Sequence, residues 1–206
     1  RTAELLNRPL NELKIITLHL GSGASVAAIK NGKAFDSSMG FTPLTGLTMG
    51  TRAGDVDPAI VPFLMEKEGM TAEEVMTLLN DRSGLLGISE SSSDMRDIEA
   101  AWQKGDRQAS LAREIFINRV VKYVGAYFAE LGGIDALVLA GGIGEHQIDL
   151  RLALLKQLRV LGIEVDEKLN QANQEGIISP KDAQIKTMLI PTNEELQMVR
   201  QIKKEI

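Results

Sequence analysis

Arg52 is the only cation in a long stretch of small and apolar residues, MGFTPLTGLTMGTRAGDVDP at positions 39–58. The stretch has the period of neither a helix nor a strand, which predicts an ordered loop of the kind that often carries binding or catalytic residues. A guanidinium suits bidentate contact with phosphate oxygens and the charge that develops during phosphoryl transfer. Asp55 and Asp57 could orient this arginine or bind a divalent cation through water. A surface salt-bridge cluster that caps a helix beginning near Pro58 would explain the same residues.

Two glycine-centred turns, HLGSG at 19–23 and GGIGE at 141–145, each follow a predicted strand. The carboxyl ends of strands are where open α/β sheets bind ligands. In the first turn, two glycines let backbone N–H groups approach an anion and Ser22 adds a hydroxyl, although an ordinary hairpin turn has the same composition. The second turn precedes a helix, whose free N–H groups suit a phosphate or a ribose, although close helix–strand packing also favours glycine. This second turn completes neither a dinucleotide fingerprint nor a Walker A loop.

Three further candidates have simple structural explanations when each is taken alone. Asp94, Met95 and Arg96 follow three serines and look like a capped helix start. Glu194 falls in the first turn of a predicted helix, where the helix dipole favours a carboxylate. A histidine on a strand, such as His19, is more often a core residue than a catalytic base.

The surrounding pattern predicts the elements that position these candidates. Residues 15–38 form short apolar segments separated by glycine turns, and they predict a three-stranded antiparallel meander. The continuous apolar run 136–140 predicts a strand covered on both faces, and 187–191 predicts a second buried strand. A meander followed by alternating helices and strands indicates a layered α/β domain. Helices are predicted at 58–69, 71–80, 94–102, 107–131, 147–160 and from 192 onward.

The overall composition excludes several classes of protein. The 206 residues are 44% hydrophobic, and their net charge of −5 gives no general attraction to nucleic acid or to an anionic membrane. No apolar run approaches the ~20 residues that span a bilayer. The absence of cysteine excludes disulfides and thiolate sites and fits the cytoplasm, and two histidines are too few for a multi-histidine metal site. The chain begins at Arg1 without a methionine, so we expect a piece of a longer protein.

Five segments together resemble the C-terminal half of the acetate kinase family: KIITLHLGSGAS, MGFTPLTGLTMGTRAGDVDP, SSSDMRD, VLAGGIGE and IPTNEEL. They occur in the family's order and at similar spacings across essentially the whole chain. The resemblance implies an α/β fold of the actin, hexokinase and Hsp70 (ribonuclease H-like) type, with a mixed sheet flanked by helices. It also implies reversible phosphoryl transfer from ATP to acetate, giving acetyl phosphate and ADP. Residues 1–206 would be the single C-terminal nucleotide-binding domain of a two-domain kinase, whose N-terminal domain is absent from this chain.

The resemblance also assigns roles to individual residues. Arg52 would stabilise the phosphoryl group in transit, and Glu194 would help to hold Mg²⁺ or Mn²⁺. Ser22 and His146 depart from the family, which usually has asparagine at both positions, and this bears on nucleotide preference more than on the reaction. The nucleotide-binding residues would be His19, Leu20, Gly21, Ser22, Gly23, Asp94, Met95, Arg96, Gly141, Gly142, Ile143, Gly144 and Glu145.

Family kinases form homodimers largely through this half, and the apolar helix at 107–131 is a candidate part of the dimer interface. Burial in the core explains the apolar character of this helix more simply. None of the family's N-terminal motifs for acetate and the transition state occurs in this chain. We therefore expect the chain alone to bind nucleotide weakly at best and to turn over nothing. The alternatives are a propionate or butyrate kinase of the same family and a non-catalytic nucleotide-binding or dimerisation module in which Arg52 is dispensable. A dehydrogenase is disfavoured by the incomplete dinucleotide fingerprint.

Overall fold

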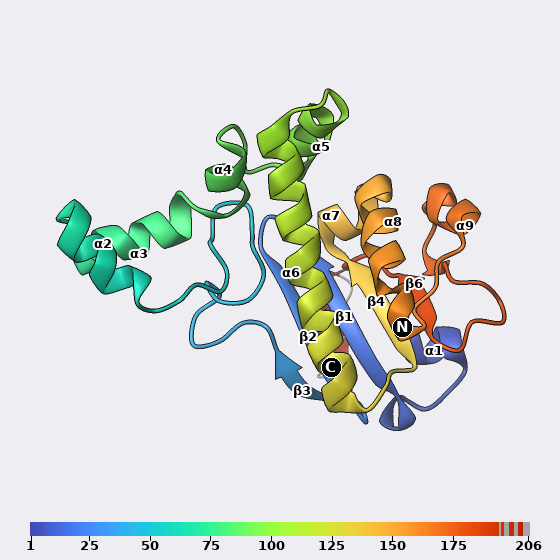
Figure 1. Ribbon diagram of the computed structural model, residues 1–206. Helices are drawn as coiled ribbons and strands as arrows, with labels where there is room; N and C mark the ends of the chain where they lie inside the picture. The colour runs from blue at the N-terminus through green and yellow to red at the C-terminus, as the bar shows by residue number, and fades with distance from the viewer. Residues whose placement is uncertain (194, 196–197, 200–201, 204–206) are drawn as a thin grey trace.

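The described part of the chain folds around one six-stranded mixed sheet (Figure 1). The computed structural model describes residues 1–193, 195, 198–199 and 202–203. The predicted meander is confirmed, since its three strands pair antiparallel, and the next two long strands add to it in parallel. The strand order is β3-β2-β1-β4-β6-β5. The strands are β1 (Lys14–Leu20), β2 (Ala24–Lys30), β3 (Lys33–Ser37), β4 (Ala136–Ala140), β5 (Gly176–Ile177) and β6 (Lys186–Leu189).

The helices agree with the prediction in most places, and the structure adds several short helices that were not predicted. Thr71 and Glu74 form a capping box at the start of the helix predicted from residue 71, and Asp94 caps its helix by accepting a hydrogen bond from the Arg96 N–H. The GGIGE turn is itself a short helix, a one-turn helix interrupts the predicted serine-rich loop, and the predicted closing helix falls mostly outside the described residues. The α-helices are α1 (Thr2–Leu6), α2 (Ile60–Glu68), α3 (Ala72–Asp81), α4 (Gly84–Ser89), α5 (Met95–Gln103), α6 (Arg107–Leu131), α7 (Gly141–His146), α8 (Ile148–Gln157) and α9 (Glu167–Ala172), with 3-10 turns at Leu10–Glu12 and Leu158–Leu161.

Strand β4 has both faces covered, as its continuous apolar run predicts. Leu137 and Leu139 pack into the main core beneath α6 and α8, where Phe116 and Leu154 also lie. Val138 points to the opposite face, into a smaller cluster against which residues of α1 pack. Burial on both faces is what an apolar run without alternation indicates, because a strand with one wet face would alternate.

The long helix α6 crosses one face of the sheet and orders the elements around the site (Figure 1). Its positions Ala112, Phe116, Val120 and Val124, at fourfold spacing, are buried, and Phe128 at the next such position is partly buried. A buried ion pair joins it to α5, with Arg113 Nε 2.6 Å from Glu99 Oε1. The start of α5 is therefore fixed relative to the sheet. None of the helices in the described part of the chain has the length and apolar character that crossing a membrane requires.

Three parallel strands end at the same edge of the sheet. In the register, His19 of β1 lies beside Ala140 of β4, and Leu139 of β4 lies beside Leu189 of β6. The segments that follow these strands, at 21–23, in α7 and from 190 onward, therefore meet at one edge, the place where sheets of this type bind ligands. The α2–α3 pair projects away from this body (Figure 1).

Candidate functional site

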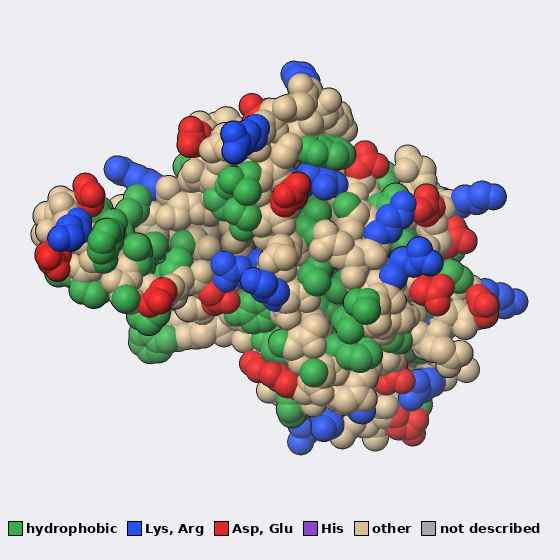
Figure 2. All heavy atoms as spheres, viewed as in Figure 1, with side chains coloured by type: hydrophobic (Ala, Val, Ile, Leu, Met, Phe, Trp, Pro, Cys, Tyr) green, Lys and Arg blue, Asp and Glu red, His purple; other side chains and the backbone are tan. Residues whose placement is uncertain are grey.

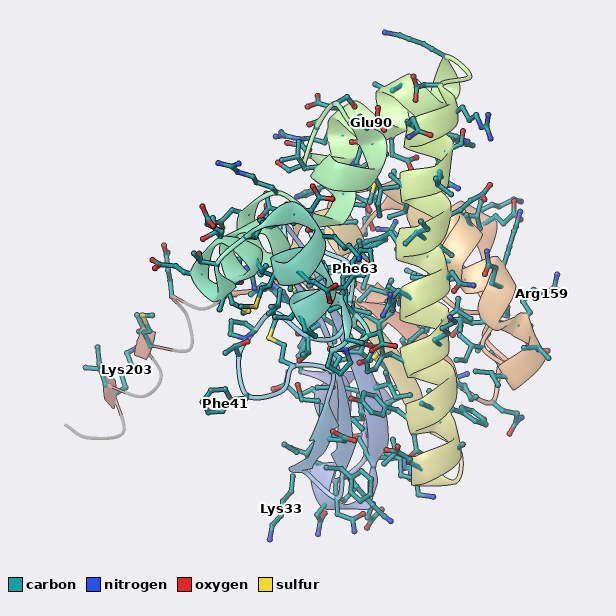
Figure 3. The ribbon with its side chains drawn as sticks, turned by 60° about the vertical axis from the view of Figure 1, so that its left-hand side comes forward. Lys33, Phe41, Phe63, Glu90, Arg159 and Lys203 are labelled. Atoms are coloured by element: carbon teal, nitrogen blue, oxygen red, sulfur yellow. The ribbon has the colours of Figure 1, made fainter. Side chains whose placement is uncertain are left out.

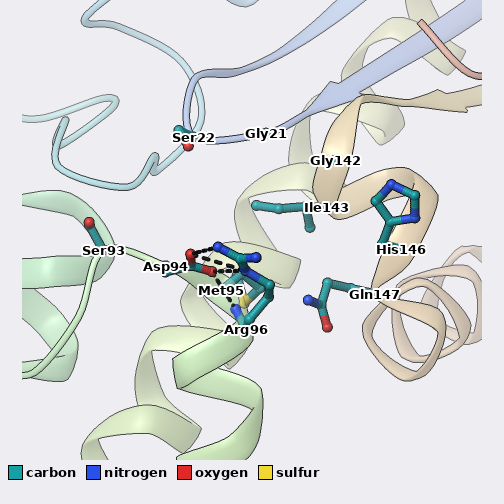
Figure 4. A pocket seen from close by; sticks show the side chains of 10 residues that line it. All are labelled: Gly21, Ser22, Ser93, Asp94, Met95, Arg96, Gly142, Ile143, His146 and Gln147. Carbon is teal, nitrogen blue, oxygen red and sulfur yellow. Dashed lines mark hydrogen bonds and ion pairs between the residues drawn. The ribbon is translucent and has the colours of Figure 1, made fainter.

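A cavity of about 230 Å³ opens at this edge of the sheet (Figure 4). The turn between β1 and β2, the start of α5 and the helix α7 each supply part of its wall, so three of the motifs noted in the sequence meet here. Its lining residues are Gly21, Ser22, Ser93, Asp94, Met95, Arg96, Gly142, Ile143, His146 and Gln147.

The turn after β1 lies directly against Arg52. A Cβ placed on Gly23 would sit 3.1 Å from Arg52 Nη2, so the absence of a side chain at this position leaves room for the guanidinium. The Gly50 N–H, two residues before the arginine, donates to the Ser22 carbonyl at 3.0 Å. Among the described residues, the Arg52 guanidinium donates only to the Pro43 carbonyl, at 2.8 Å. Its remaining N–H groups are available to an incoming anion.

The two aspartates of the Arg52 loop do not contact the arginine. Asp57 Oδ1 accepts the Ala59 N–H at 2.9 Å, immediately before α2 begins. Asp55 Oδ1 accepts the Gly46 N–H at 2.8 Å, and its other oxygen faces α6. Salt bridging describes Asp55, which pairs with Arg119, better than direct orientation of Arg52 does. Asp57 binds the N–H just before α2 without capping that helix.

Asp94 and Arg96 form a rigid pair on the wall opposite α7. Asp94 Oδ1 accepts both the backbone N–H of Arg96, at 2.8 Å, and its Nε, at 3.0 Å. The hydrogen bonds from Arg96 lower the pKa of the Asp94 carboxyl, which therefore stays ionised at neutral pH. This ion pair holds a largely exposed guanidinium at the mouth of the cavity (Figure 4). Met95 is buried beneath it.

Helix α7 approaches β1 too closely for any side chain at its first residue. Gly141 has a φ of +79°, and a Cβ there would lie 2.7 Å from the Leu20 carbonyl oxygen. Glu145 Oε1 accepts the Gly141 N–H at 2.9 Å and the Thr192 N–H at 3.1 Å, and so ties the end of β6 to the start of α7. Close packing against β1 therefore accounts for the glycine at the start of this segment.

A buried arginine that sequence reasoning missed fixes the other end of α7. Arg151 is 1% exposed, and its Nη1 donates to the Gly144 carbonyl at 2.7 Å and the Glu145 carbonyl at 3.0 Å. Its Nε donates to Asn170 Oδ1 at 2.6 Å, and burial lowers its pKa. A cation at the carboxyl end of a helix is favourably placed. Nothing in the local spacing around Arg151 signals this role, because its partners come from two other segments, α7 and α9 with the residue that caps it.

The predicted site residues divide into two groups. Those that line the cavity are Gly21, Ser22, Asp94, Met95, Arg96, Gly142 and Ile143. The others adjoin it: His19, whose Nδ1 lies 3.5 Å from Thr192 Oγ1, the core residue Leu20, and Gly23, Gly141, Gly144 and Glu145. Ser93, His146 and Gln147 line the cavity without having been predicted as site residues. Ser93 directly precedes Asp94, and His146 and Gln147 are the two residues after Glu145, so their neighbours were the available signal.

The predicted metal ligand Glu194 lies outside the described residues. Among the residues that the structure does describe, no group of three histidine, aspartate or glutamate side chains is arranged to hold a metal ion.

Comparison with known proteins shows extensive similarity to one family. The model of the acetokinase family matches residues 1–200. The acetate kinase of Limosilactobacillus fermentum is 54% identical over 205 residues, which cover 99% of this chain and 52% of that protein. Among solved structures, the acetate kinase of Porphyromonas gingivalis superposes with a TM-score of 0.94 at 45% identity, covering 98% of this chain and 51% of that one. A propionate kinase from Francisella tularensis gives a TM-score of 0.88 at 41% identity, covering 95% and 50%.

These similarities confirm the predicted fold class, a mixed sheet flanked by helices as in the acetate kinases. The chain spans about half the length of the curated relatives that it matches.

Proposed function

This chain belongs to the acetokinase family, and on that premise we propose that it is the nucleotide-binding half of a cytoplasmic acetate kinase. The complete enzyme would transfer a phosphoryl group reversibly from ATP to acetate, giving acetyl phosphate and ADP. Residues 1–206 would form its C-terminal domain. The observation that carries the proposal is the position of Arg52, whose guanidinium lies against the turn at residues 21–23 with N–H groups unused by the described residues.

The nucleotide would lie between α5 and α7. The turn at residues 21–23 is the element that both lines the cavity and touches Arg52, so the phosphates would lie there. The adenosine would then occupy the remainder of the cavity, between Arg96 and α7. Phosphoryl transfer depends mainly on positioning and on neutralising charge, and a loop arginine beside the phosphates supplies both.

A divalent cation fits this proposal through the chemistry of its ligands. Mg²⁺ usually keeps several waters and binds through one or two carboxylates together with substrate phosphates. The described residues contain no acidic cluster, so the phosphates would supply most of the ligands and Glu194 would add a carboxylate. When bound, Mg²⁺ or Mn²⁺ would neutralise part of the charge on the phosphates.

Two surface features support further parts of the proposal. The side chain of Phe41, in the Arg52 loop, is fully exposed, and a second domain over the site would cover it (Figure 3). The α2–α3 pair also presents apolar side chains, among them Phe63 and Met65 at 53% and 40% exposure (Figure 2). These fit the homodimer that the family resemblance implies. Sedimentation of the chain at micromolar concentration would detect such a dimer.

The acyl substrate could be propionate or butyrate rather than acetate, and the similarity to a propionate kinase keeps this alternative open. A non-catalytic nucleotide-binding or dimerisation module is the alternative from a different class, and it requires that Arg52 be dispensable.

The proposal is tested by joining this chain to the half of the Limosilactobacillus fermentum acetate kinase that it does not match, here called the joined enzyme. Product formation from ATP and acetate, propionate or butyrate is measured for the joined enzyme, for this chain alone and for the intact relative. We expect acetyl phosphate from the joined enzyme, with acetate the best acceptor, and no product from the chain alone. A joined enzyme that unfolds cooperatively yet forms no acyl phosphate would contradict the proposal, and robust synthesis by the chain alone would contradict the division into halves.

A further inference from the structure

Asp55 joins the two ends of the loop that carries Arg52, and the bonded residues 46 and 55 are here called the neck of the loop. Its Oδ1 accepts the Gly46 N–H at 2.8 Å, and its own N–H donates to the Gly46 carbonyl at 3.0 Å. Residues 46 and 55 are thus joined twice, and Arg52 lies within the segment that they enclose. Gly46 cannot be replaced simply, because its φ is +100° and a Cβ there would lie 2.4 Å from the Ser38 carbonyl oxygen.

The second oxygen of Asp55 attaches this neck to α6. The Tyr123 hydroxyl donates to Asp55 Oδ2 at 2.7 Å, and Arg119 Nη1 lies 3.2 Å from the same oxygen. Arg119 also donates to the Asp55 backbone carbonyl at 3.2 Å. Burial, and after it the hydrogen bond to Asp55, raises the pKa of Tyr123 to about 12, so its hydroxyl remains a donor at neutral pH. The anchor is firm because α6 packs along the sheet.

Within the part of the chain that the structure describes, this arrangement leaves the charge of Arg52 without a carboxylate partner. Its backbone is held instead, since the Met49 N–H donates to the Arg52 carbonyl at 3.0 Å and the Ala53 N–H donates to the Leu79 carbonyl at 2.9 Å. A carboxylate paired with Arg52 would compete with an incoming phosphate. Asp55, three residues further along the chain, pairs with Arg119 and restrains the loop from its base.

We propose that Asp55, together with Tyr123 and Arg119, is a positioning residue for phosphoryl transfer, which holds the Arg52 loop against the phosphate-binding turn without touching the substrate. The proposal rests on the proposed function. It predicts that loosening the neck lowers the rate of the chemical step while nucleotide affinity is kept, because the cavity walls at α5 and α7 are separate elements.

Two variants test whether the neck positions Arg52. Tyr123→Phe removes one hydroxyl, and Asp55→Asn removes one charge. Tyr127→Phe is the matched control, because Tyr127 lies one turn along the same helix, packs edge-on against Tyr123 at 5.8 Å between ring centroids, and forms no hydrogen bond to Asp55. In the joined enzyme we expect kcat to fall about 10-fold for Tyr123→Phe and about 100-fold for Asp55→Asn, since small misplacements of a catalytic group have effects of this size. The KM for ADP should change less than about twofold, and Tyr127→Phe should resemble the parent.

Hydrogen exchange in this chain alone gives a second readout. The amides of Gly46, Met49 and Asp55 should exchange at least about 10-fold faster in Tyr123→Phe and Asp55→Asn, while the amides of β1 and β4 keep their protection. Three results would each overturn the inference. The first is equal kcat values for the Tyr123→Phe and Tyr127→Phe enzymes, and the second is a KM for ADP that rises by the same factor by which kcat falls. The third is unchanged hydrogen exchange at these amides. A joined enzyme that is inactive before any substitution would overturn the proposed function instead, and with it the catalytic part of this inference.

Discussion

Replacing Arg52 by alanine is expected to lower the kcat of the joined enzyme by at least about 1,000-fold, because an arginine that stabilises the transferred phosphoryl group contributes a factor of this order. The KM for ADP should stay within about threefold of the parent value, since interactions made only in the transition state affect kcat and not ground-state binding. The geometry supports a large effect on kcat with little effect on the KM for ADP. Arg52 touches the turn at residues 21–23 but is not part of the cavity wall.

Two further variants make the Arg52 measurement specific. Arg52→Lys keeps the charge but loses the planar fork, so its kcat should fall between those of the alanine variant and the parent. Arg82→Ala removes an exposed arginine that lies outside the cavity wall, and it should behave like the parent. An Arg52→Ala enzyme that retained more than about a tenth of the parent kcat would contradict the role of Arg52 in stabilising the transferred phosphoryl group.

Gly141→Ala is expected to lower the free energy of unfolding of this chain by about 2–4 kcal/mol, a range typical of substitutions that combine backbone strain with a steric clash. The residue has a φ of +79°, which disfavours any side chain, and its Cβ would lie 2.7 Å from the Leu20 carbonyl oxygen. Relief of the clash would move α7 away from the end of β1 and from the turn that follows it, and α7 and this turn both line the cavity. Nucleotide binding should therefore weaken in the variant even at temperatures where it remains folded.

The neighbouring glycine offers a matched control for this prediction. A Cβ on Gly142 would meet no atom within 4 Å, and the residue lies in a short helix with an ordinary helical φ. Gly142→Ala should therefore leave stability unchanged or raise it by up to about 1 kcal/mol, which is the helix preference of alanine over glycine. Denaturant unfolding of both variants measures the difference, and equal midpoints would contradict the packing described for α7.

The sequence predicted those features that depend on local pattern. The apolar run of β4 indicated burial on both faces, and the structure places Leu137 and Val138 in two different clusters. Thr71 and Asp94 cap the helices that their positions predict, because capping involves residues only two or three positions apart. The glycine turns at the ends of β1 and β4 meet because the carboxyl ends of parallel strands share one edge.

Features built from distant partners were not predictable in the same way. Tyr123 and Asp55 are 68 positions apart, and only the course of α6 across the sheet brings them together. Arg151 binds carbonyls of α7 and the side chain of Asn170, so its role as the cap of α7 depends on three segments. The spacing of Asp57 and Arg52 is compatible with direct orientation of the arginine, whereas the Asp57 carboxylate accepts the N–H of Ala59, two residues away. Long-range side-chain pairs follow from tertiary arrangement, which residue spacing alone does not encode.

We propose that this domain binds a nucleotide between α5 and α7, and calorimetric titration of the joined enzyme with Mg·ADP tests this binding most directly. Arg96→Ala is measured beside Arg159→Ala, which removes an exposed arginine outside the cavity wall (Figure 3). We expect saturable binding that weakens about 10-fold in Arg96→Ala, the effect of one charge-assisted contact, and is unchanged in Arg159→Ala. A folded joined enzyme that shows no saturation, or equal affinities for the two variants, would contradict the proposal.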